Sequence, residues 1–262
     1  MSPRRSVAEA RQTRVEILAC GVRLASAEGL EGLTIGRLAA ELNLSKSGVL
    51  GHFGTKEELQ LAVIDAAADI FAREVADPAR AAPPGLRKLT AMCEAWVSYL
   101  ERRVFPGGCF FTAAASEFDD RPGRVRDTIA GLTSVWDRDL YRQIRTATAD
   151  GDLPAGTDAE QLVFEVSGVM LGLNHALQLH RDTTAPAKAR RALGRLLGQP
   201  VAAVLVMLAL ASGPRFESSI RHRLFRRGRV RLSTAGRGAA WRERRPALKR
   251  SGRLKCGAAH TG

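Results

Sequence analysis

Hydroxyl, amine, imidazole and glycine residues gather in a short stretch near the N-terminus of this 262-residue chain. Hydroxyls and an amine donate hydrogen bonds to phosphate oxygens and base edges, and small side chains let a backbone approach closely. The free N–H groups at the start of a helix also attract phosphate. The residues that combine these properties are Thr34, Ser45, Lys46, Ser47, Gly48, His52 and Lys56. The pattern predicts a DNA interface over residues 34–56.

Two short helices must hold these side chains. Thr34 precedes an apolar-periodic stretch over 35–42, and Ser45 precedes another that reaches about residue 53, so each is expected to be a helix N-cap. Asn43 and Leu44 form the turn between them. The side chains expected to form the shared core of this unit are Ile35, Leu38, Ala39, Leu42, Leu44, Val49, Leu50 and Phe53.

Two further helices are expected to complete the unit. Short helices joined so tightly cross steeply, and a third helix, predicted over residues 6–28, must bury their apolar faces. Thr55 begins a longer helix from residue 56 to about 75, and Glu58 completes a capping box. This arrangement is a helix-turn-helix, and the alternative is a three-helix packing unit with no role in DNA binding.

The remainder of the chain repeats the 3.6-residue period of helices and has no convincing alternation of strands. After a Pro- and Ala-rich connector at 77–85, helices are predicted over 86–103, 109–118, 122–150, 158–180 and 187–197. The predicted fold is therefore all-α. It comprises a helix-turn-helix domain over 1–55, a helical ligand-binding and dimerisation domain over 56–200, and an apolar run followed by a basic, disordered tail over 201–262.

The stretch LTIGRLAAELNLSKSGVLGHFGTKEELQLAV, residues 33–63, resembles the DNA-binding domain of TetR-family repressors. The resemblance rests on Thr34, the Leu38-Ala39-Ala40 step, Ser45, Gly48, His52-Phe53 and Lys56-Glu57-Glu58-Leu59, with Ile17-Leu18 and Glu28-Gly29 upstream. Gly51 departs from the family, which usually has an aromatic residue before the histidine. This departure affects the expected operator preference more than the fold.

The resemblance implies an Ω-shaped homodimer that reads a palindromic operator with two recognition helices about 34–36 Å apart. It also implies an unknown small-molecule effector that releases DNA, and such an effector must bind the DNA-incompetent arrangement more tightly. The predicted function is ligand-controlled transcriptional regulation, most simply repression, in the cytoplasm. The competing hypothesis is a non-specific nucleic-acid or anionic-membrane binder driven by the basic tail.

Aromatic residues and a methionine cluster around the broken helices of the second domain. The expected pocket residues are Met92, Trp96, Phe105, Phe110, Phe111 and Trp136. Trp96 and Trp136 are favoured because a buried indole needs a partner for its N–H group. The alternative is ordinary core packing. Similarly, the break at 106–108 is either a hinge or pocket mouth or a plain connector.

Helices 122–150 and 158–180 are candidates to pair with their copies in a four-helix bundle, the alternative being packing within one chain. Ser167, Gly168 and Gly172 are small enough to allow close approach. His175 and His180 are five residues apart and are not expected to share a helix face as a metal pair would.

Other classes of protein fit less well. The chain has no Gly-rich phosphate loop, no G-x-S-x-G motif and no interpretable Ser/His/Asp set, so we expect no catalytic residues, metal or cofactor, and an enzyme is the weaker alternative. Four scattered cysteines suit reduced thiols, and the polar N-terminus is not expected to be a secretory signal. No membrane span is expected, because the apolar run at 201–211 is shorter than the ~20 residues required.

The net charge of +13 lies entirely in residues 213–262, which hold 15 basic and 2 acidic residues. The DNA-binding prediction therefore depends on local residues and not on total charge. The tail could bind nucleic acid, lie on an anionic membrane, or be an extension without a role. We favour the last interpretation and expect truncation after Gly213 to preserve operator affinity.

Overall fold

The computed structural model describes residues 7–198, and every regular element in that range is a helix. The predicted all-α fold is therefore confirmed for this part of the chain. The expectations for the apolar run and the basic tail, residues 201–262, fall outside the described residues. No helix within 7–198 is long and apolar enough to cross a membrane.

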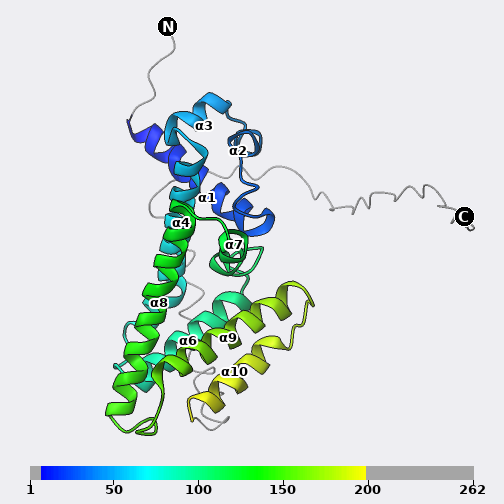
Figure 1. Ribbon diagram of the computed structural model, residues 1–262. Coiled ribbons are helices and arrows are strands. Elements are labelled where there is room, and N and C mark those ends of the chain that lie inside the picture. The colour runs from blue at the N-terminus through cyan, green and yellow to red at the C-terminus, as the bar shows by residue number, and fades with distance from the viewer. Residues whose placement is uncertain (1–6, 199–262) are drawn as a thin grey trace, which may run out of the picture. The chain divides into compact units, whose positions relative to one another are not determined.

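The first helices form a small head, seen at one end of the described part in Figure 1. The helices are α1 (Val7–Glu28), α2 (Ile35–Leu42), α3 (Lys46–Phe53) and α4 (Lys56–Phe71). Each of the last three has the expected hydroxyl cap: Thr34 accepts from the Arg37 N–H, Ser45 from Gly48 and Thr55 from Glu58. The sequence therefore locates these helix starts to the residue.

One expected core residue of the head is not in the core. Val49 and Phe53 are buried on one face of α3, whereas Leu50 keeps 42% of its surface exposed. Successive helical residues are rotated by about 100°, so a residue next to Val49 cannot share its buried face. The predicted placement of Leu50 was wrong, and its apolar side chain lies on the outer surface.

The body begins where α4 changes its geometry. The helix predicted to reach about residue 75 ends at Phe71 and passes into a π-helical turn, η1 (Ala72–Ala76), and a short α5 (Asp77–Ala79). A π-helical turn is rare and often marks a functional site. The remaining elements are α6 (Leu86–Glu101), α7 (Phe110–Phe118), α8 (Arg124–Ala149), α9 (Ala159–Gln178) and α10 (Ala185–Leu196).

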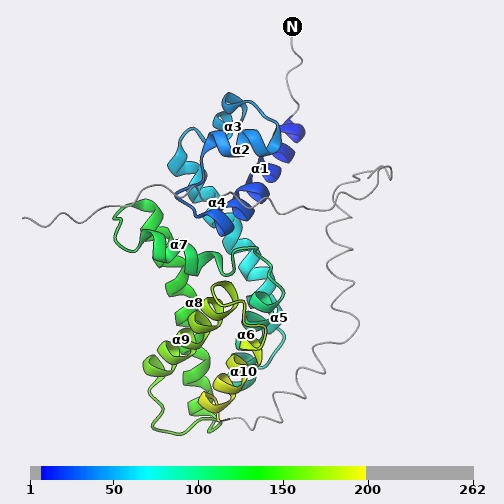
Figure 2. The ribbon, with the colours of Figure 1, turned by 90° about the vertical axis from the view of Figure 1, so that its right-hand side faces the viewer.

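The body packs as a helical bundle in which α4 lies against α8, and α6 lies against both α8 and α9 (Figure 2). Helix α10 covers α6 and α9, and the Arg190 guanidinium pairs with Glu94 and Glu101 of α6 at 2.7 and 2.8 Å. A stripe of apolar residues on α8 faces the core, where Val125, Ile129, Leu140 and Ile144 are buried. Leu132 and Trp136 of this stripe are partly buried against the core.

Candidate functional site

The outer face of α3 combines a cation, a hydroxyl and an apolar group. Four residues on α3 are all exposed: Lys46, Ser47, Leu50 and Gly51. Lys46 lies about one turn from Leu50, and Ser47 about one turn from Gly51, so the four share one side of the helix. A Cβ atom at Gly51 would meet nothing within 4 Å. The missing aromatic residue therefore leaves open space on this face without disturbing the packing beneath it.

Two of the predicted hydroxyl residues also cap helices. Ser45 Oγ accepts from Gly48 N at 3.0 Å and lies 3.1 Å from Ser47 Oγ, while Thr34 Oγ1 accepts from Arg37 N at 3.0 Å. A cap uses the lone pairs of a hydroxyl and leaves its hydrogen free to donate. Gly48 must stay small, because a Cβ there would lie 3.0 Å from Ser45 Oγ.

Three cations of the head are paired with carboxylates. Arg23 and Arg37 both bind Glu41, and Arg37 also binds Glu28. Lys56, a predicted phosphate contact, donates to the carbonyl and the carboxylate of Glu31 at 2.8 and 2.9 Å. Of the predicted DNA contacts, only Lys46 is an exposed cation with no ion pair among the described residues. Lys46, at the start of α3, is therefore available to an anionic partner.

Arg14 of α1 fixes the end of α3, a role that the sequence did not indicate. Its guanidinium donates to the His52 carbonyl at 2.5 Å and lies 4.3 Å from the centre of the Phe53 ring. His52, a predicted DNA contact, is half-buried beside Phe53, with ring centroids 6.2 Å apart. Arg14 of α1 therefore anchors the C-terminal end of α3.

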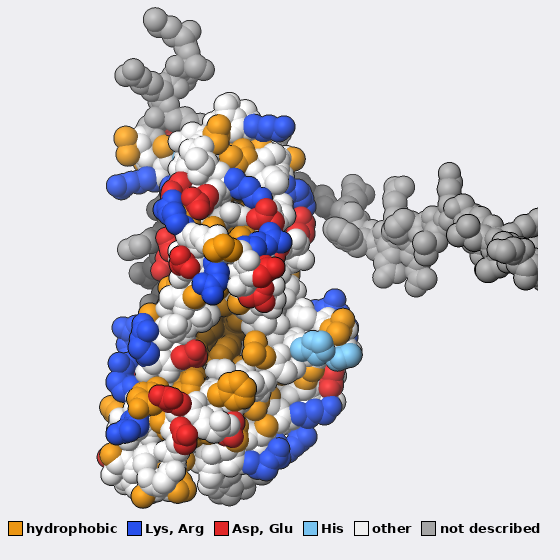
Figure 3. Space-filling model, in the orientation of Figure 1, with side chains coloured by type: hydrophobic (Ala, Val, Ile, Leu, Met, Phe, Trp, Pro, Cys, Tyr) orange, Lys and Arg blue, Asp and Glu red, His pale blue; other side chains and the backbone are white. Residues whose placement is uncertain are grey.

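A network of aromatic rings occupies the body. Phe71, the last residue of α4, makes edge contacts with Trp96, Tyr99, Phe111 and Trp136 at centroid distances of 5.0 to 6.0 Å. Phe105 extends the network from Tyr99 to Phe110 at 5.8 and 6.1 Å. Met92, also a predicted pocket residue, is buried in the core. Figure 3 shows a hollow lined by hydrophobic side chains on this domain, between α8 and α9.

Several buried polar atoms in this region have no hydrogen-bond partner among the described residues. They include Trp96 Nε1, Trp136 Nε1 and Gln178 Nε2. Tyr99 is only 1% exposed, and burial raises the pKa of its phenol far above the ordinary value. Hydrogen bonds with the Phe110 backbone and with the Cys109 side chain also act on this pKa, the first lowering it and the second raising it. Tyr99 was missed as a candidate, although it follows Trp96 by about one helical turn.

The body contacts the head through α7 and the turn that precedes it. The Glu117 carboxylate of α7 accepts from the Leu30 backbone N–H at 2.7 Å. Gly107 packs so closely that a Cβ there would overlap the Ser26 carbonyl of α1. Across the same turn, Cys109 N donates to Asn174 Oδ1 of α9 at 2.8 Å. The break at 106–108 is therefore a packed junction between α1 and α9.

A second junction joins α8 to the start of α4. Arg124 binds Glu58 at 2.5 Å and Glu57 at 3.2 Å. The Glu58 carboxylate therefore reaches α8. The predicted capping box would instead have turned it back toward Thr55. Movement of α7 or α8 would act directly on the head.

One face of the body presents apolar side chains outward. Phe164, Leu171 and Leu179 of α9 and Val135 of α8 are exposed, Phe164 by 74%. Gly168 and Gly172 on α9, and Gly131 on α8, face open space. Ser167 is different, because its hydroxyl oxygen is buried. This face has the apolar and small residues that close helix packing requires.

The two histidines lie closer together than their spacing had suggested. The His175 and His180 rings meet edge to face, with centroids 5.1 Å apart, because His180 lies just beyond the end of α9. Residues 7–198 hold no group of three or more His, Cys, Asp or Glu side chains able to bind a metal.

Comparisons with known proteins agree with this architecture. Residues 17–63 match the family model for bacterial regulatory proteins of the tetR family, and residues 85–193 match the model for a tetracyclin repressor-like C-terminal domain. No curated protein sequence matches the chain.

Solved structures share the fold at low sequence identity. A TetR transcriptional regulator from Chloroflexus aurantiacus J-10-FL is 24% identical, with a TM-score of 0.66, and the match covers 73% of this chain and 96% of that one. AibR, bound to isovaleryl coenzyme A and operator DNA, is 20% identical with a TM-score of 0.60, covering 71% and 98%. A cysteine mutant of CifR, bound to a 26-bp operator, is 23% identical with a TM-score of 0.59, covering 70% and 95%.

Proposed function

The chain belongs to the TetR family of bacterial transcriptional regulators, and we propose that it binds operator DNA through α3 and releases it when a small molecule enters the body. The observation that carries this proposal is the outer face of α3. There, Lys46 is exposed beside Ser47 and Leu50 and has no ion pair among the described residues, whereas Arg23, Arg37 and Lys56 are paired with carboxylates. The proposal places this action in the cytoplasm, where operator DNA is found.

Each group on that face has a suitable DNA partner. Lys46 and the Ser47 hydroxyl can donate to phosphate oxygens or to guanine, and Leu50 can contact a thymine methyl group. Lys56 is a weaker candidate than the sequence suggested, because a phosphate would have to compete with Glu31 for its amine. AibR and CifR were both solved with operator DNA, which supports this role for the same fold.

The exposed apolar face of α8 and α9 supports a homodimer. Phe164, Leu171 and Val135 would be buried there, and the glycines at 168 and 172 would let the partner helices approach closely. In a symmetric dimer the same patch meets its own copy. Two α3 helices held in this way would read the two halves of a palindrome.

Ligand control requires the body and the head to be coupled. The aromatic network includes Phe110 and Phe111 at the start of α7, while Glu117 near its end holds the Leu30 backbone. A ligand that separates the rings would move α7 and disturb this contact. The ligand must bind the displaced arrangement more tightly, since equal affinity for both would shift nothing. AibR was solved with isovaleryl coenzyme A as well as DNA.

The test is selection of binding sites from random duplex DNA by the full-length protein, with non-specific competitor present. We expect an inverted repeat whose half-sites are about one helical turn apart. The purified protein should sediment as a dimer, and Phe164→Asp should shift it toward monomer and weaken binding to the repeat. Enrichment of no sequence would contradict the proposed function.

A further inference from the structure

The rings of the aromatic network meet edge to face. Phe71 contacts Tyr99, Phe111 and Trp136 at interplanar angles of 79° to 88°. Trp96 and Trp136 meet each other in the same way, at 5.4 Å and 86°. Aromatic faces attract the edges of other rings and also accept a stacked ring. A flat aromatic molecule is therefore the shape that these faces can bind with the least rearrangement.

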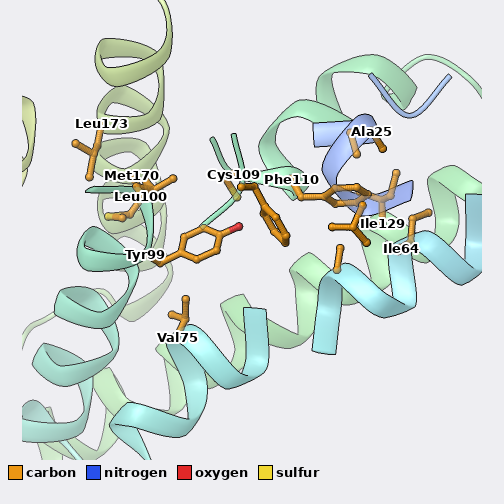
Figure 4. Packing of buried hydrophobic residues seen from close by; sticks show 14 of the residues in the cluster. Ala25, Ile64, Val75, Tyr99, Leu100, Cys109, Phe110, Ile129, Met170 and Leu173 are labelled. Carbon is orange, nitrogen blue, oxygen red and sulfur yellow. The ribbon is translucent and has the colours of Figure 1, made fainter. Parts of the chain in front are cut away.

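The buried polar atoms around these rings are donors without acceptors. An indole N–H can only donate, which applies to Trp96 Nε1 and Trp136 Nε1. The amide nitrogen of Gln178 is also a donor. The Tyr99 phenol, by contrast, already has hydrogen bonds with Cys109 and Phe110. In Figure 4, the Tyr99 ring extends from α6 into the interior, with its oxygen on the side of Cys109 and Phe110. The acceptors that are missing are those that a ligand would supply.

Such donors reduce the stability of the unliganded protein. Native proteins leave few buried polar groups unpaired, because each one loses its hydrogen bonds to water without a replacement. The retention of several unpaired donors beside one aromatic network is therefore better explained by binding than by packing.

The same surroundings disfavour a charged ligand. The ring network contains no Lys or Arg, and no charged side chain is among the buried polar residues of the described chain. A carboxylate would lose its hydration there without a counterion. An ammonium group would bring further donors to a place that lacks acceptors. The chemistry that remains is an uncharged molecule with acceptor oxygens.

We propose that the aromatic network binds an uncharged, flat aromatic compound whose carbonyl or ether oxygens accept hydrogen bonds from Trp96 and Trp136. This inference deepens the proposed function and rests on it, because it assigns a chemical class to the effector of the regulator. An aromatic ketone is the simplest member of that class.

The test uses full-length protein and two flat ketones of different size, fluorenone and benzanthrone. Each is compared with its hydrocarbon lacking the oxygen, and with carboxylate and amine derivatives of the same skeleton. Binding is measured by calorimetry and by the shift in melting temperature. We expect at least one ketone to bind about tenfold or more tightly than its hydrocarbon, and the charged derivatives to bind more weakly. Failure of all ketones, or equal binding by a hydrocarbon or a charged derivative, would overturn the proposal.

Two variants each remove one indole donor. Trp96→Phe and Trp136→Phe should each reduce the ratio of ketone affinity to hydrocarbon affinity by about tenfold, because the smaller ring acts on both affinities whereas the lost N–H group acts on the ketone alone. Tyr141→Phe is the matched control, because Tyr141 is exposed on α8 and makes none of the ring contacts of the network. An unchanged ratio in both variants would contradict the assigned donors.

DNA binding by the same preparations separates the two hypotheses. Sequence-specific DNA binding without ketone binding would refute the ligand class and leave the DNA-binding function standing. Ketone binding that leaves DNA affinity unchanged would support the ligand class and refute its role in regulation.

Discussion

The head and the body treat their hydrogen-bonding side chains in opposite ways. In the head, the Thr34, Ser45 and Thr55 hydroxyls each accept from a backbone N–H at the start of a helix, at 3.0 to 3.1 Å. In the body, the indole N–H groups of Trp96 and Trp136 are buried among aromatic rings with no hydrogen-bond partner among the described residues. The N–H groups at these helix starts of the head have acceptors, whereas the buried donors of the body lack them.

This difference matches the two tasks that we assign to them. A surface that recognises DNA must hold its side chains in one arrangement before contact, and capped helices with paired cations provide that. A ligand-controlled body needs a second arrangement that becomes favourable only when the ligand is bound. Glu117 and Gly107 connect the two regions, because they contact Leu30 and Ser26 of the head.

The largest effect is expected where the two regions meet. Gly107→Val places carbon atoms where the Ser26 carbonyl lies, and overpacking against backbone that cannot yield costs about 3 kcal/mol. Urea denaturation at fixed protein concentration measures the loss of unfolding free energy. Gly156→Val is the control, since a Cβ at Gly156 meets nothing within 4 Å. Equal effects of the two changes would rule out a tight junction at Gly107.

The fold was largely predictable from the sequence, because caps and periodicity are local. Thr34, Ser45 and Thr55 marked helix starts that the structure confirms. The π-helical turn after Phe71 was not predictable, since it depends on how α4 packs and not on its apolar period. The placement of Leu50 in the core was wrong because the apolar character of a residue in a short helix does not identify the face on which it lies.

The site was less predictable, because its properties depend on contacts between distant residues. The sequence could not indicate that Glu31 engages Lys56, or that Arg14 reaches the carbonyl of His52. Trp96 and Trp136 were identified from the need of an indole for a partner, and the structure brings them into one network. Tyr99 was missed because a single tyrosine on an apolar helix face suggests ordinary core.

The next effect concerns the surface of the head. Lys46→Ala should weaken binding to the selected DNA site by about 1–3 kcal/mol, roughly tenfold to a hundredfold, because an unpaired amine is removed from the contact face. Fluorescence anisotropy with labelled DNA measures the affinity. Arg145→Ala, an equal change of charge on an exposed residue of α8, should leave the affinity within about twofold. If both variants lose affinity equally, only total charge matters.

A matched pair of hydroxyl deletions tests the caps of the head. Thr55→Val removes a cap that accepts from Glu58 N and should lower the unfolding free energy by about 1 kcal/mol. Tyr141→Phe removes an exposed hydroxyl of α8 and should change the unfolding free energy by less than about 0.5 kcal/mol. Both are measured by urea denaturation. Equal effects of the two changes would mean that the Thr55 cap adds no stability.

The smallest effect is expected at Gly51. Gly51→Tyr fills open space on α3, and the higher helix propensity of tyrosine should raise stability by about 0.5 kcal/mol. The new ring would also add a contact on the DNA face and change the sequence preference found by selection. Thermal melting and repeated site selection measure the two effects. An unchanged preference would place residue 51 away from DNA.

The central claim is that α3, and not total positive charge, recognises DNA. The most direct measurement is nuclease footprinting of the full-length protein and its Lys46→Ala variant on the DNA flanking the protein's own gene, with competitor DNA and at several salt concentrations. The account predicts one protected palindrome that Lys46→Ala weakens strongly. Binding without a footprint, lost steeply as salt rises and equal in both proteins, would contradict it.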